Sequence, residues 1–285
     1  MALDLGVLLL VLMAAGLHAS WNALVKAGGD RLVMTTLVMV GPAPLCIAAL
    51  FFLPAIQPGA WPFLIASSLI HYAYYALMIA AYNHGDLSQV YPIQRGCAPA
   101  LVAIAAWAFA GEALTAFEIL GVVIVSIGIM SLAWRRNGAT RLPAETRGIM
   151  FALANGVTIA SYLIADGMGV RRAGDPLTYI CWLFVLESVP MLAVTLWLRR
   201  GRIGAAFAPH WIKGIFGGMI AAISYGIAIW AMSLGPMAHI VALRETSVIF
   251  GAALGTLVLK ESFGRQRILA ACMVAAGAVL LNAGL

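Results

Sequence analysis

The chain has 285 residues, of which 63% are hydrophobic and only 10% are charged, and its mean hydropathy is +0.98. A soluble domain keeps roughly a quarter of its residues charged, so this composition excludes a water-soluble protein and indicates one that is solvated by lipid. The net charge of +6 does not indicate nucleic-acid binding, because the basic residues lie mostly in short loops and form no basic face.

Ten apolar segments are long enough to cross a bilayer as helices, each of which needs about 20 residues. Their uninterrupted apolar character excludes an outer-membrane barrel, whose strands alternate apolar and polar residues. The first segment has no basic leader and continues past Trp21, so it is predicted to be a retained helix and not a signal peptide. The predicted helices are Leu5–Val25, Leu32–Leu53, Pro62–Tyr82, Leu87–Ala110, Thr115–Trp134, Gly148–Ala165, Leu177–Leu198, Ile212–Leu234, Ala238–Leu259 and Ile268–Leu281.

Polar residues inside a membrane span face the protein interior and are candidates for function. In the first predicted helix, His18 and Asn22 lie four residues apart and share a face. They either line a cavity or form hydrogen bonds between helices. The third helix carries His71, Tyr75 and Tyr82 on one face, although a tyrosine near a span end, such as Tyr82, is also typical of an interfacial anchor.

The later helices contribute further polar and aromatic candidates for a substrate site. The fourth helix continues the polar character of the third with Tyr91, Gln94 and Arg95. The candidates from the sixth to the ninth helix are Ser161, Tyr162, Trp182, Glu187, Tyr225, Trp230, Arg244 and Glu245. Tyrosine and tryptophan faces can hold an ammonium group by cation–π attraction.

The two halves of the chain are similar in sequence. Tyr75–Gly85 matches Tyr225–Gly235, and Glu112 corresponds to Glu261 just after the fourth helix of each half. Two related halves that each have five helices, an odd number, must insert with opposite orientations, and such inverted repeats place a binding site near mid-membrane. The predicted organisation is a first repeat at 1–134, a linker at 135–147 and a second repeat at 148–285.

Four charged residues are predicted inside the spans, namely Arg95, Glu187, Arg244 and Glu245. By the repeat alignment Arg95 corresponds to Glu245, so the two either form a buried structural ion pair or contribute to a ligand site. An arginine can bind a carboxylate with two hydrogen bonds, and a glutamate can receive an ammonium group or a proton. Glu187 is the predicted proton-coupling residue because no cation adjoins it in the sequence.

The basic residues outside the spans predict the orientation of the chain. All of them except Arg171 and Arg172 fall on the side of the central linker. The positive-inside rule therefore places the linker in the cytoplasm. Both termini are then periplasmic in a multi-pass protein of the bacterial inner membrane.

These features resemble the drug/metabolite transporter superfamily in its ten-helix EamA-type branch, and within it an amino-acid exporter. The sequence features that carry the resemblance are the two five-helix halves, Gly111-Glu112 and its echo Lys260-Glu261, Gly128 and Gly277, and the stretches His18–Asn22 and Gly85–Pro92. The resemblance covers essentially the whole chain. It implies an all-α membrane protein with two inverted five-helix repeats around a central cavity, and it does not specify the substrate.

The sequence therefore predicts a secondary-active transporter of small polar metabolites that works by alternating access, with export of an amino acid or similar zwitterion as the favoured activity. The alternative substrates are quaternary amines, drugs and organophosphorus metabolites. No enzyme is predicted, because HExxH, GxSxG and GxxxxGK patterns are missing from the sequence. No metal or other cofactor is predicted, because the four cysteines have no metal-ligand spacing. The expected partners are the small-molecule substrate and the bilayer, for a monomer or a homodimer.

Overall fold

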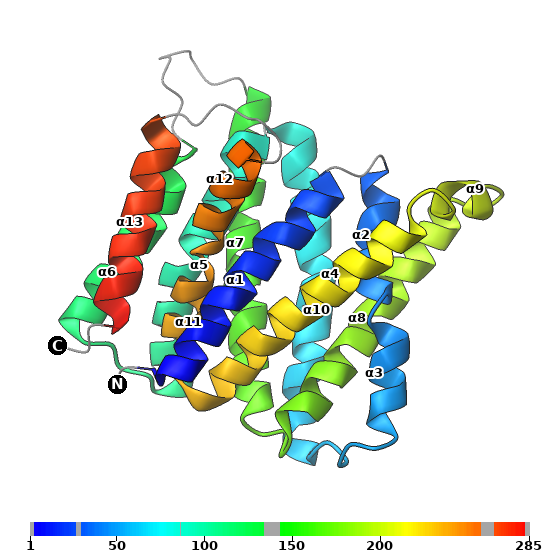
Figure 1. Ribbon diagram of the computed structural model, residues 1–285, viewed down its shortest axis with the longest axis horizontal. Helices are drawn as coiled ribbons and strands as arrows, with labels where there is room; N and C mark the ends of the chain where they lie inside the picture. Colours follow the sequence, from blue (N-terminus) through cyan, green and yellow to red (C-terminus); the bar gives the residue numbers. More distant parts are fainter. Residues whose placement is uncertain (1–2, 27–29, 86, 134–142, 258–264, 283–285) are drawn as a thin grey trace.

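The computed structural model describes residues 3–26, 30–85, 87–133, 143–257 and 265–282, and Figure 1 shows these residues as a bundle of helices. They form α1 (Leu5–Lys26), α2 (Arg31–Val40), α3 (Ala43–Leu50), a 3-10 turn η1 (Pro58–Ala60), α4 (Trp61–His84), α5 (Leu87–Ala110), α6 (Ala116–Ser131), α7 (Pro143–Val170), α8 (Pro176–Leu198), α9 (Ile203–Phe207), α10 (Trp211–Leu234), α11 (Met237–Arg244), α12 (Ser247–Leu257) and α13 (Arg265–Asn282). Among the described residues, seven spans are helical and apolar enough to cross a membrane, and α6 and α13 are shorter apolar helices.

Each of the ten predicted segments coincides with one helix or with two consecutive helices. Two of the segments are interrupted and a third is too short. The second segment is not continuous, because the chain turns at Gly41-Pro42 between α2 and α3, where proline cannot continue the hydrogen-bonding pattern. The ninth segment divides into α11 and α12, and Thr246 Oγ1 donates to the Leu243 carbonyl at this break. The sixth helix is longer than predicted, because α7 includes the end of the predicted linker and runs on to Val170. The rest of that linker lies outside the described residues.

Short polar residues begin several helices, since the first turn of a helix has backbone N–H groups without partners. The Asp30 side chain accepts from two such groups at the start of α2, and the Asp175 side chain accepts from one, the Thr178 N–H, at the start of α8. Thr115 and Glu118 form a reciprocal capping box at the start of α6. Gly111, with φ of 69°, adopts the left-handed conformation between α5 and α6. These local signals set the helix ends.

Helix pairs in the first half of the chain recur in the second half. Helix α4 packs on α7 as α10 packs on α1, and α5 packs on α7 as α12 packs on α1. The pairs α2–α8 and α6–α13 each join corresponding helices, and α6 and α13 approach closely enough that a Cβ on Gly121 would lie 2.9 Å from the Gly277 carbonyl oxygen. If each helix is replaced by its counterpart in the other half, the same set of contacting pairs results. In Figure 1, α1 leads away from the end that holds both termini, whereas α7 leads toward it, so these corresponding helices run in opposite directions.

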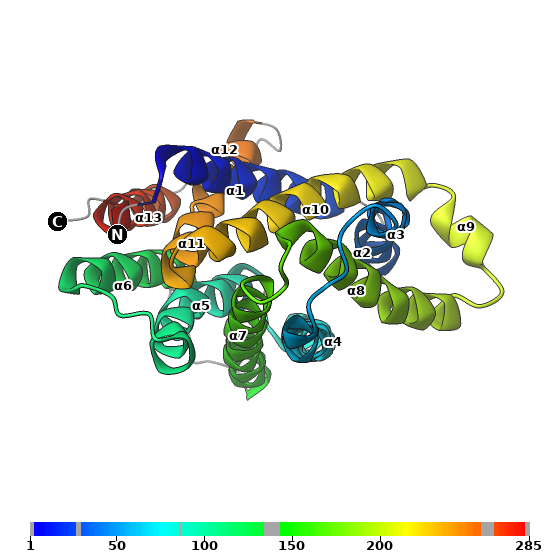
Figure 2. The same cartoon turned by 90° about the horizontal axis from the view of Figure 1, so that it is seen from below.

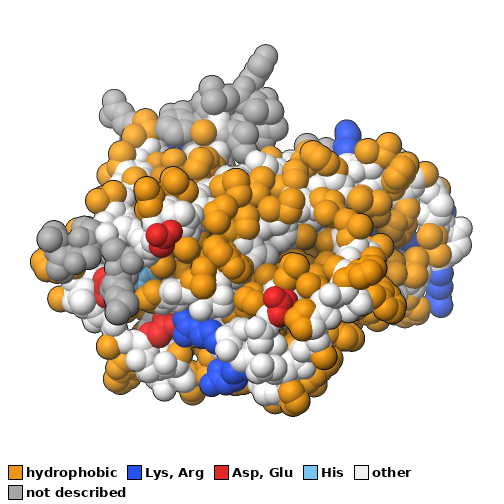
Figure 3. All heavy atoms as spheres, turned by 60° about the horizontal axis from the view of Figure 1, so that its bottom comes forward, with side chains coloured by type: hydrophobic (Ala, Val, Ile, Leu, Met, Phe, Trp, Pro, Cys, Tyr) orange, Lys and Arg blue, Asp and Glu red, His pale blue; other side chains and the backbone are white. Residues whose placement is uncertain are grey.

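The outer surface of the bundle is apolar, and the face in Figure 3 is mostly hydrophobic with few charged side chains. Large side chains such as Phe52, Trp107 and Trp197 are exposed by 90%, 67% and 63%. Such a surface is unfavourable in water and matches hydrocarbon. The chain is therefore a multi-pass membrane protein. In the view from below (Figure 2), α11 lies among the other helices, and it contacts α1, α5, α6 and α10.

Candidate functional site

Charged and aromatic side chains from seven helices meet inside the bundle. We call this group the central cluster, and its members are His18, His71, Arg95, Tyr162, Asp166, Glu187, Tyr225, Arg244 and Glu245. All of them are buried except Tyr225, which is half-buried. Ionisable groups are costly inside a membrane and mark functional positions, so the central cluster is the candidate site.

Arg95 and Glu245 form a direct ion pair, with 2.8 Å between Nη2 of Arg95 and Oε1 of Glu245. Arg95 lies on α5, and Glu245 lies at the break between α11 and α12, so the pair joins the two halves of the chain. Both side chains are at least nine-tenths buried. The two charges neutralise one another, which leaves Arg95 without a free charge for a ligand.

Arg244 is adjacent to Glu245 in the sequence but has different surroundings. Its guanidinium carbon lies 4.8 Å from the centre of the Tyr225 ring, and Nη2 lies 3.3 Å from Nδ1 of His18. Among the described residues, no carboxylate lies within ion-pair distance of Arg244, and its buried Nε has no hydrogen-bond partner. A buried cation in this state is poised to receive an anionic group.

His71 lies at the centre of an aromatic group next to Glu187. Its Nδ1 is 2.9 Å from the Ser67 carbonyl oxygen, to which it donates, and 3.1 Å from Oε1 of Glu187. Its ring stacks on Tyr162 with 3.9 Å between centroids. Tyr74, Tyr75 and Tyr225 lie farther out, with centroids 6.3 to 6.5 Å from that of His71. The site thus combines a carboxylate with several aromatic faces.

Asp166 is a site residue that the sequence analysis missed. It is fully buried on α7, and its carboxylate accepts hydrogen bonds from Tyr179 at 3.0 Å and from Tyr225 at 2.5 Å. The predicted sixth helix ended at Ala165, one residue short of Asp166, whereas α7 continues to Val170. Asp166 is followed by Gly167 and Gly169, which pack against Met237 and Tyr179, and an apolar run extended to Val170 would have included it.

Several other predicted site residues form hydrogen bonds between helices near the cluster. Gln94 Nε2 donates to the Tyr82 hydroxyl at 3.2 Å, and Asn155 Nδ2 donates to Gln94 Oε1 at 2.9 Å, so these bonds link α4, α5 and α7. The Tyr75 hydroxyl contacts Met39 Sδ at 2.9 Å. Tyr91 lies on α5, one turn before Arg95.

Four further predicted site residues belong neither to the central cluster nor to the group of residues just described. Ser161 is exposed and donates to the carbonyl of Val157 on its own helix. Asn22 donates to the His18 carbonyl, again within one helix. Trp182 packs on Trp61 and lines a separate hollow of about 400 Å³, while Trp230 packs against the apolar core.

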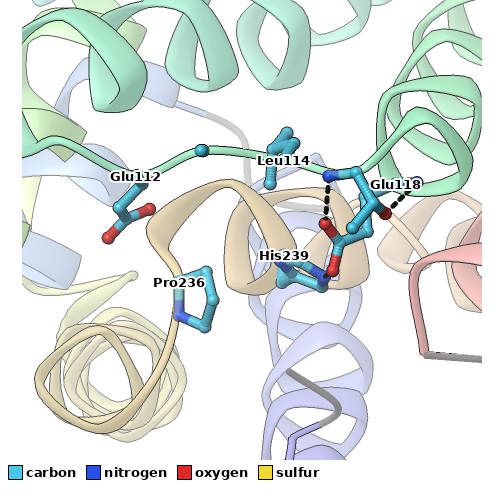
Figure 4. Close-up of a pocket in the computed structure, with 7 residues that line it drawn as sticks. Glu112, Leu114, Glu118, Pro236 and His239 are labelled. Atoms are coloured by element: carbon cyan, nitrogen blue, oxygen red, sulfur yellow. Dashed lines mark hydrogen bonds and ion pairs between the residues drawn. The ribbon is translucent and has the colours of Figure 1, made fainter.

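A hollow of about 280 Å³ lies on the side of the molecule that holds both termini, and Figure 4 shows it in close-up. Nη2 of Arg171, at the end of α7, lies 2.7 Å from Oε1 of Glu112 in the loop between α5 and α6. The other Glu112 oxygen accepts from the Met237 N–H at 2.8 Å. Glu118 and His239 point toward one another with 3.1 Å between Oε1 and Nε2. The residues that line the hollow are Glu112, Ala113, Leu114, Thr115, Glu118, Pro236 and His239.

Neither of these hollows includes a member of the central cluster. The side chains of the central cluster are buried in this conformation, apart from the half-buried Tyr225. The Arg171–Glu112 ion pair joins the two halves of the chain near the first hollow.

Comparisons with known proteins bear on the identity of this fold. A solved structure, described as "Crystal structure of protein", is similar with a TM-score of 0.69 and 16% sequence identity, covering 96% of this chain and 94% of that one. At this identity the likeness concerns the fold alone. No curated protein matches the sequence. The sequence model of the EamA-like transporter family matches residues 5–134 and 146–283. Because these two stretches include nearly all of the chain, the protein belongs to the EamA-like transporter family and is a multi-pass membrane transporter.

Proposed function

We propose that the protein is a secondary-active exporter of amino acids or similar small zwitterions. Membership of the EamA-like transporter family supports a transport role. The observation that supports this substrate class is the buried guanidinium of Arg244, which has no carboxylate partner among the described residues. Burying such a charge is costly unless a ligand compensates it. An amino acid offers the missing carboxylate.

The remaining charges of the central cluster complement the other end of a zwitterion. Arg95 and Glu245 neutralise each other. The charged groups of the central cluster that remain are therefore the carboxyls of Glu187 and Asp166 and the guanidinium of Arg244. In the proposal, Arg244 binds the substrate carboxylate, and Glu187 receives either the ammonium group or the coupling proton. Aromatic faces such as that of Tyr162 add cation–π attraction for the ammonium group.

The proposed mechanism is alternating access by movement of two inverted repeats, at 1–134 and 148–285, about a site between them. The burial of the central cluster corresponds to an occluded state. Opening on the side of the termini requires separation of the Arg171–Glu112 pair, because that pair joins the halves there.

Quaternary amines remain the second candidate substrate class, because the tyrosine rings around His71 resemble the aromatic surroundings that such cations prefer. The charge of Arg244 opposes a purely cationic ligand. The two classes therefore differ in what they require of this residue.

A thermal-shift screen of the purified protein distinguishes the substrate classes, because a ligand that binds the folded state raises its Tm. We expect amino acids to stabilise the protein more than the matching decarboxylated amines, and Arg244→Gln to remove the difference. A larger shift with quaternary amines, unchanged in Arg244→Gln, contradicts the zwitterion proposal. Efflux from proteoliposomes with and without a pH gradient then tests transport and proton coupling directly.

The proposed location is the bacterial inner membrane, with both termini in the periplasm. This orientation is supported by the predicted distribution of basic residues outside the spans, where only Arg171 and Arg172 are on the side of the termini. A membrane-impermeant maleimide should label a cysteine added at either terminus of a cysteine-free variant in intact cells. It should label a cysteine placed at 135–142 only after the cells are opened. The reverse pattern contradicts the orientation.

A further inference from the structure

Asp166 is a buried carboxylate to which the proposed substrate site assigns no role. Its side chain is fully buried, and its two oxygens accept hydrogen bonds from Tyr179 on α8 and Tyr225 on α10. Among the described residues, no basic side chain lies within ion-pair distance of it. Two neutral hydroxyls offset only part of the cost of burying a negative charge. A proton, which neutralises the carboxylate, is therefore a natural partner for Asp166.

Tyr225 connects Asp166 to the proposed substrate-binding arginine. Its hydroxyl donates to Asp166 at 2.5 Å, while the guanidinium of Arg244 lies over its ring at 4.8 Å. An ionised carboxylate can only accept hydrogen bonds, whereas a protonated one can also donate. Protonation of Asp166 therefore changes the bond that holds the Tyr225 hydroxyl, and with it the ring on which Arg244 rests.

Building on the proposed zwitterion transport, we infer that Asp166 exchanges the coupling proton and acts through Tyr225 on Arg244. With Asp166 ionised, Tyr225 is held in place and presents Arg244 to the substrate carboxylate. With Asp166 protonated, this support is lost and the substrate is released. Substrate and proton then occupy the protein alternately, as an exporter driven by proton entry requires. The proton passes between water and the Asp166 carboxylate, and no covalent bond changes in the substrate.

The groups around Asp166 explain why this role falls to Asp166 and not to Glu187. Oε1 of Glu187 lies 3.1 Å from Nδ1 of His71, next to the ring of Tyr162 that stacks on this imidazole, so Glu187 is placed to receive the substrate ammonium group together with an aromatic face. Asp166 is a positioning residue, since it reaches the substrate only through Tyr225. The charged and titratable groups of the central cluster and its surroundings on Asp166's own helix and on the helices packed against it include Tyr162 on α7, His71 and Tyr74 on α4, Arg95 on α5, Tyr179 and Glu187 on α8, Tyr225 on α10 and Arg244 on α11.

Proteoliposomes with the full-length protein and a tritiated mixture of the proteinogenic amino acids test the inference by two measurements. Counterflow at equal pH on both sides reports binding and exchange alone, whereas accumulation against a concentration gradient, driven by a pH gradient, reports coupling. For Asp166→Asn we expect measurable counterflow that no longer varies with pH, and at least a tenfold loss of driven accumulation. Tyr225→Phe keeps the ring under Arg244 and removes the hydroxyl, so it should also lose driven accumulation.

Tyr179→Phe is the matched control, because it removes one hydrogen bond to Asp166 without touching Arg244. It should keep both the pH dependence of counterflow and the driven accumulation. The inference is wrong if Asp166→Asn accumulates substrate at the parent level, or if Tyr179→Phe and Tyr225→Phe are equally impaired. Either result leaves the proposed function intact. If Asp166→Asn does not fold, the comparison of Tyr179→Phe with Tyr225→Phe still decides it. A parent protein without counterflow contradicts the proposed function and, with it, this inference.

Discussion

Arg95 and Arg244 show that two arginines buried in one membrane interior can have different roles. Arg95 has a carboxylate at 2.8 Å, whereas Arg244 rests on an aromatic ring beside an imidazole. A guanidinium paired with a carboxylate is already compensated, while one on a ring still has most of its donors available. The role of each arginine therefore follows from its neighbours.

We predict that Arg244→Lys weakens amino-acid binding roughly 10- to 100-fold, although it keeps the positive charge. A lysine offers a point charge and cannot make the two parallel hydrogen bonds of a guanidinium, and a hydrogen bond to a charged group contributes about 1.5–3 kcal/mol. Substrate-induced Tm shifts at graded concentrations measure the affinity. An affinity equal to that of the parent would show that Arg244 does not bind the carboxylate.

We predict that the Arg95–Glu245 pair is required for stability as a unit. Glu245→Gln or Arg95→Gln alone leaves one buried charge without its partner, and the expected loss is about 3–5 kcal/mol in the free energy of unfolding. The double variant has no such charge and should lose much less than the sum of the two. Denaturant titrations in mixed micelles measure this. Additive losses would show that the two residues do not interact.

The sequence was sufficient to find four of the charged residues of the site, but it missed Asp166 and some of the partners of the other four. Arg95, Glu187, Arg244 and Glu245 stand out because hydrocarbon excludes charge, and the repeat alignment alone suggested that Arg95 could meet Glu245. Ser161, in contrast, faces outward. The rotation of a helix about its axis depends on packing with its neighbours, which the spacing of small polar residues does not reveal.

At the scale of helices, apolar length predicted where the spans lie but not where they break. The break between α11 and α12 places Arg244 and Glu245 at the end of a half-helix, with the Thr246 hydroxyl bonded to the Leu243 carbonyl. A run of polar residues in mid-span was the available signal. The helix beginnings were more predictable, because Asp30, Thr115 and Asp175 are typical capping residues.

Asp30 gives a prediction with a defined pH dependence. Burial opposes its ionisation, but the Val33 N–H, the Arg199 guanidinium at 2.7 Å and the Leu32 N–H together hold the pKa of Asp30 below its usual value. A lowered pKa in the folded state means that ionised Asp30 stabilises the protein above the unfolded-state pKa of about 3.9, and that this contribution is lost as the pH falls further.

Asp30→Asn keeps the cap and removes the charge, so its Tm should be lower than that of the parent at pH 7 and should converge with it below about pH 4. Asp30→Ala also loses the cap, which costs about 1 kcal/mol more. Thermal denaturation in detergent between pH 3 and pH 7 measures both effects. A constant difference between Asp30→Asn and the parent across this range contradicts the charge contribution.

At the scale of the whole molecule, the packing of helices follows the relation between the two halves. The pairs α4–α7 and α10–α1 occupy corresponding places, and α6–α13 and α2–α8 join corresponding helices. Weak similarity such as Tyr75–Gly85 with Tyr225–Gly235 predicted that the halves are related. It could not predict that the loop with Glu112 meets the end of α7, because loop contacts depend on the final arrangement of both halves.

The Arg171–Glu112 ion pair leads to a prediction about the whole molecule. Arg171 also donates to the carbonyls of Met232 and Gly235, so one side chain holds the loops of both halves together near the hollow that Glu112 lines. Its removal should cost the closed state about 1–2 kcal/mol, because these contacts are charge-assisted but partly exposed. That corresponds to a roughly 5- to 30-fold larger population open on the side of the termini.

Leu114 lines this hollow and is half-buried, so a cysteine there reports opening in an otherwise cysteine-free protein. The rate of Leu114→Cys labelling by an impermeant maleimide should rise several-fold when Arg171→Ala is added. Arg172→Ala is the matched control, since Arg172 contacts the Met168 carbonyl and the Phe63 ring instead of Glu112. Equal rates with and without Arg171→Ala would mean that the pair does not restrain the halves. A faster rate confined to Arg171→Ala would identify this single guanidinium as a restraint on opening, because the neighbouring arginine contributes the same charge at the same end of α7.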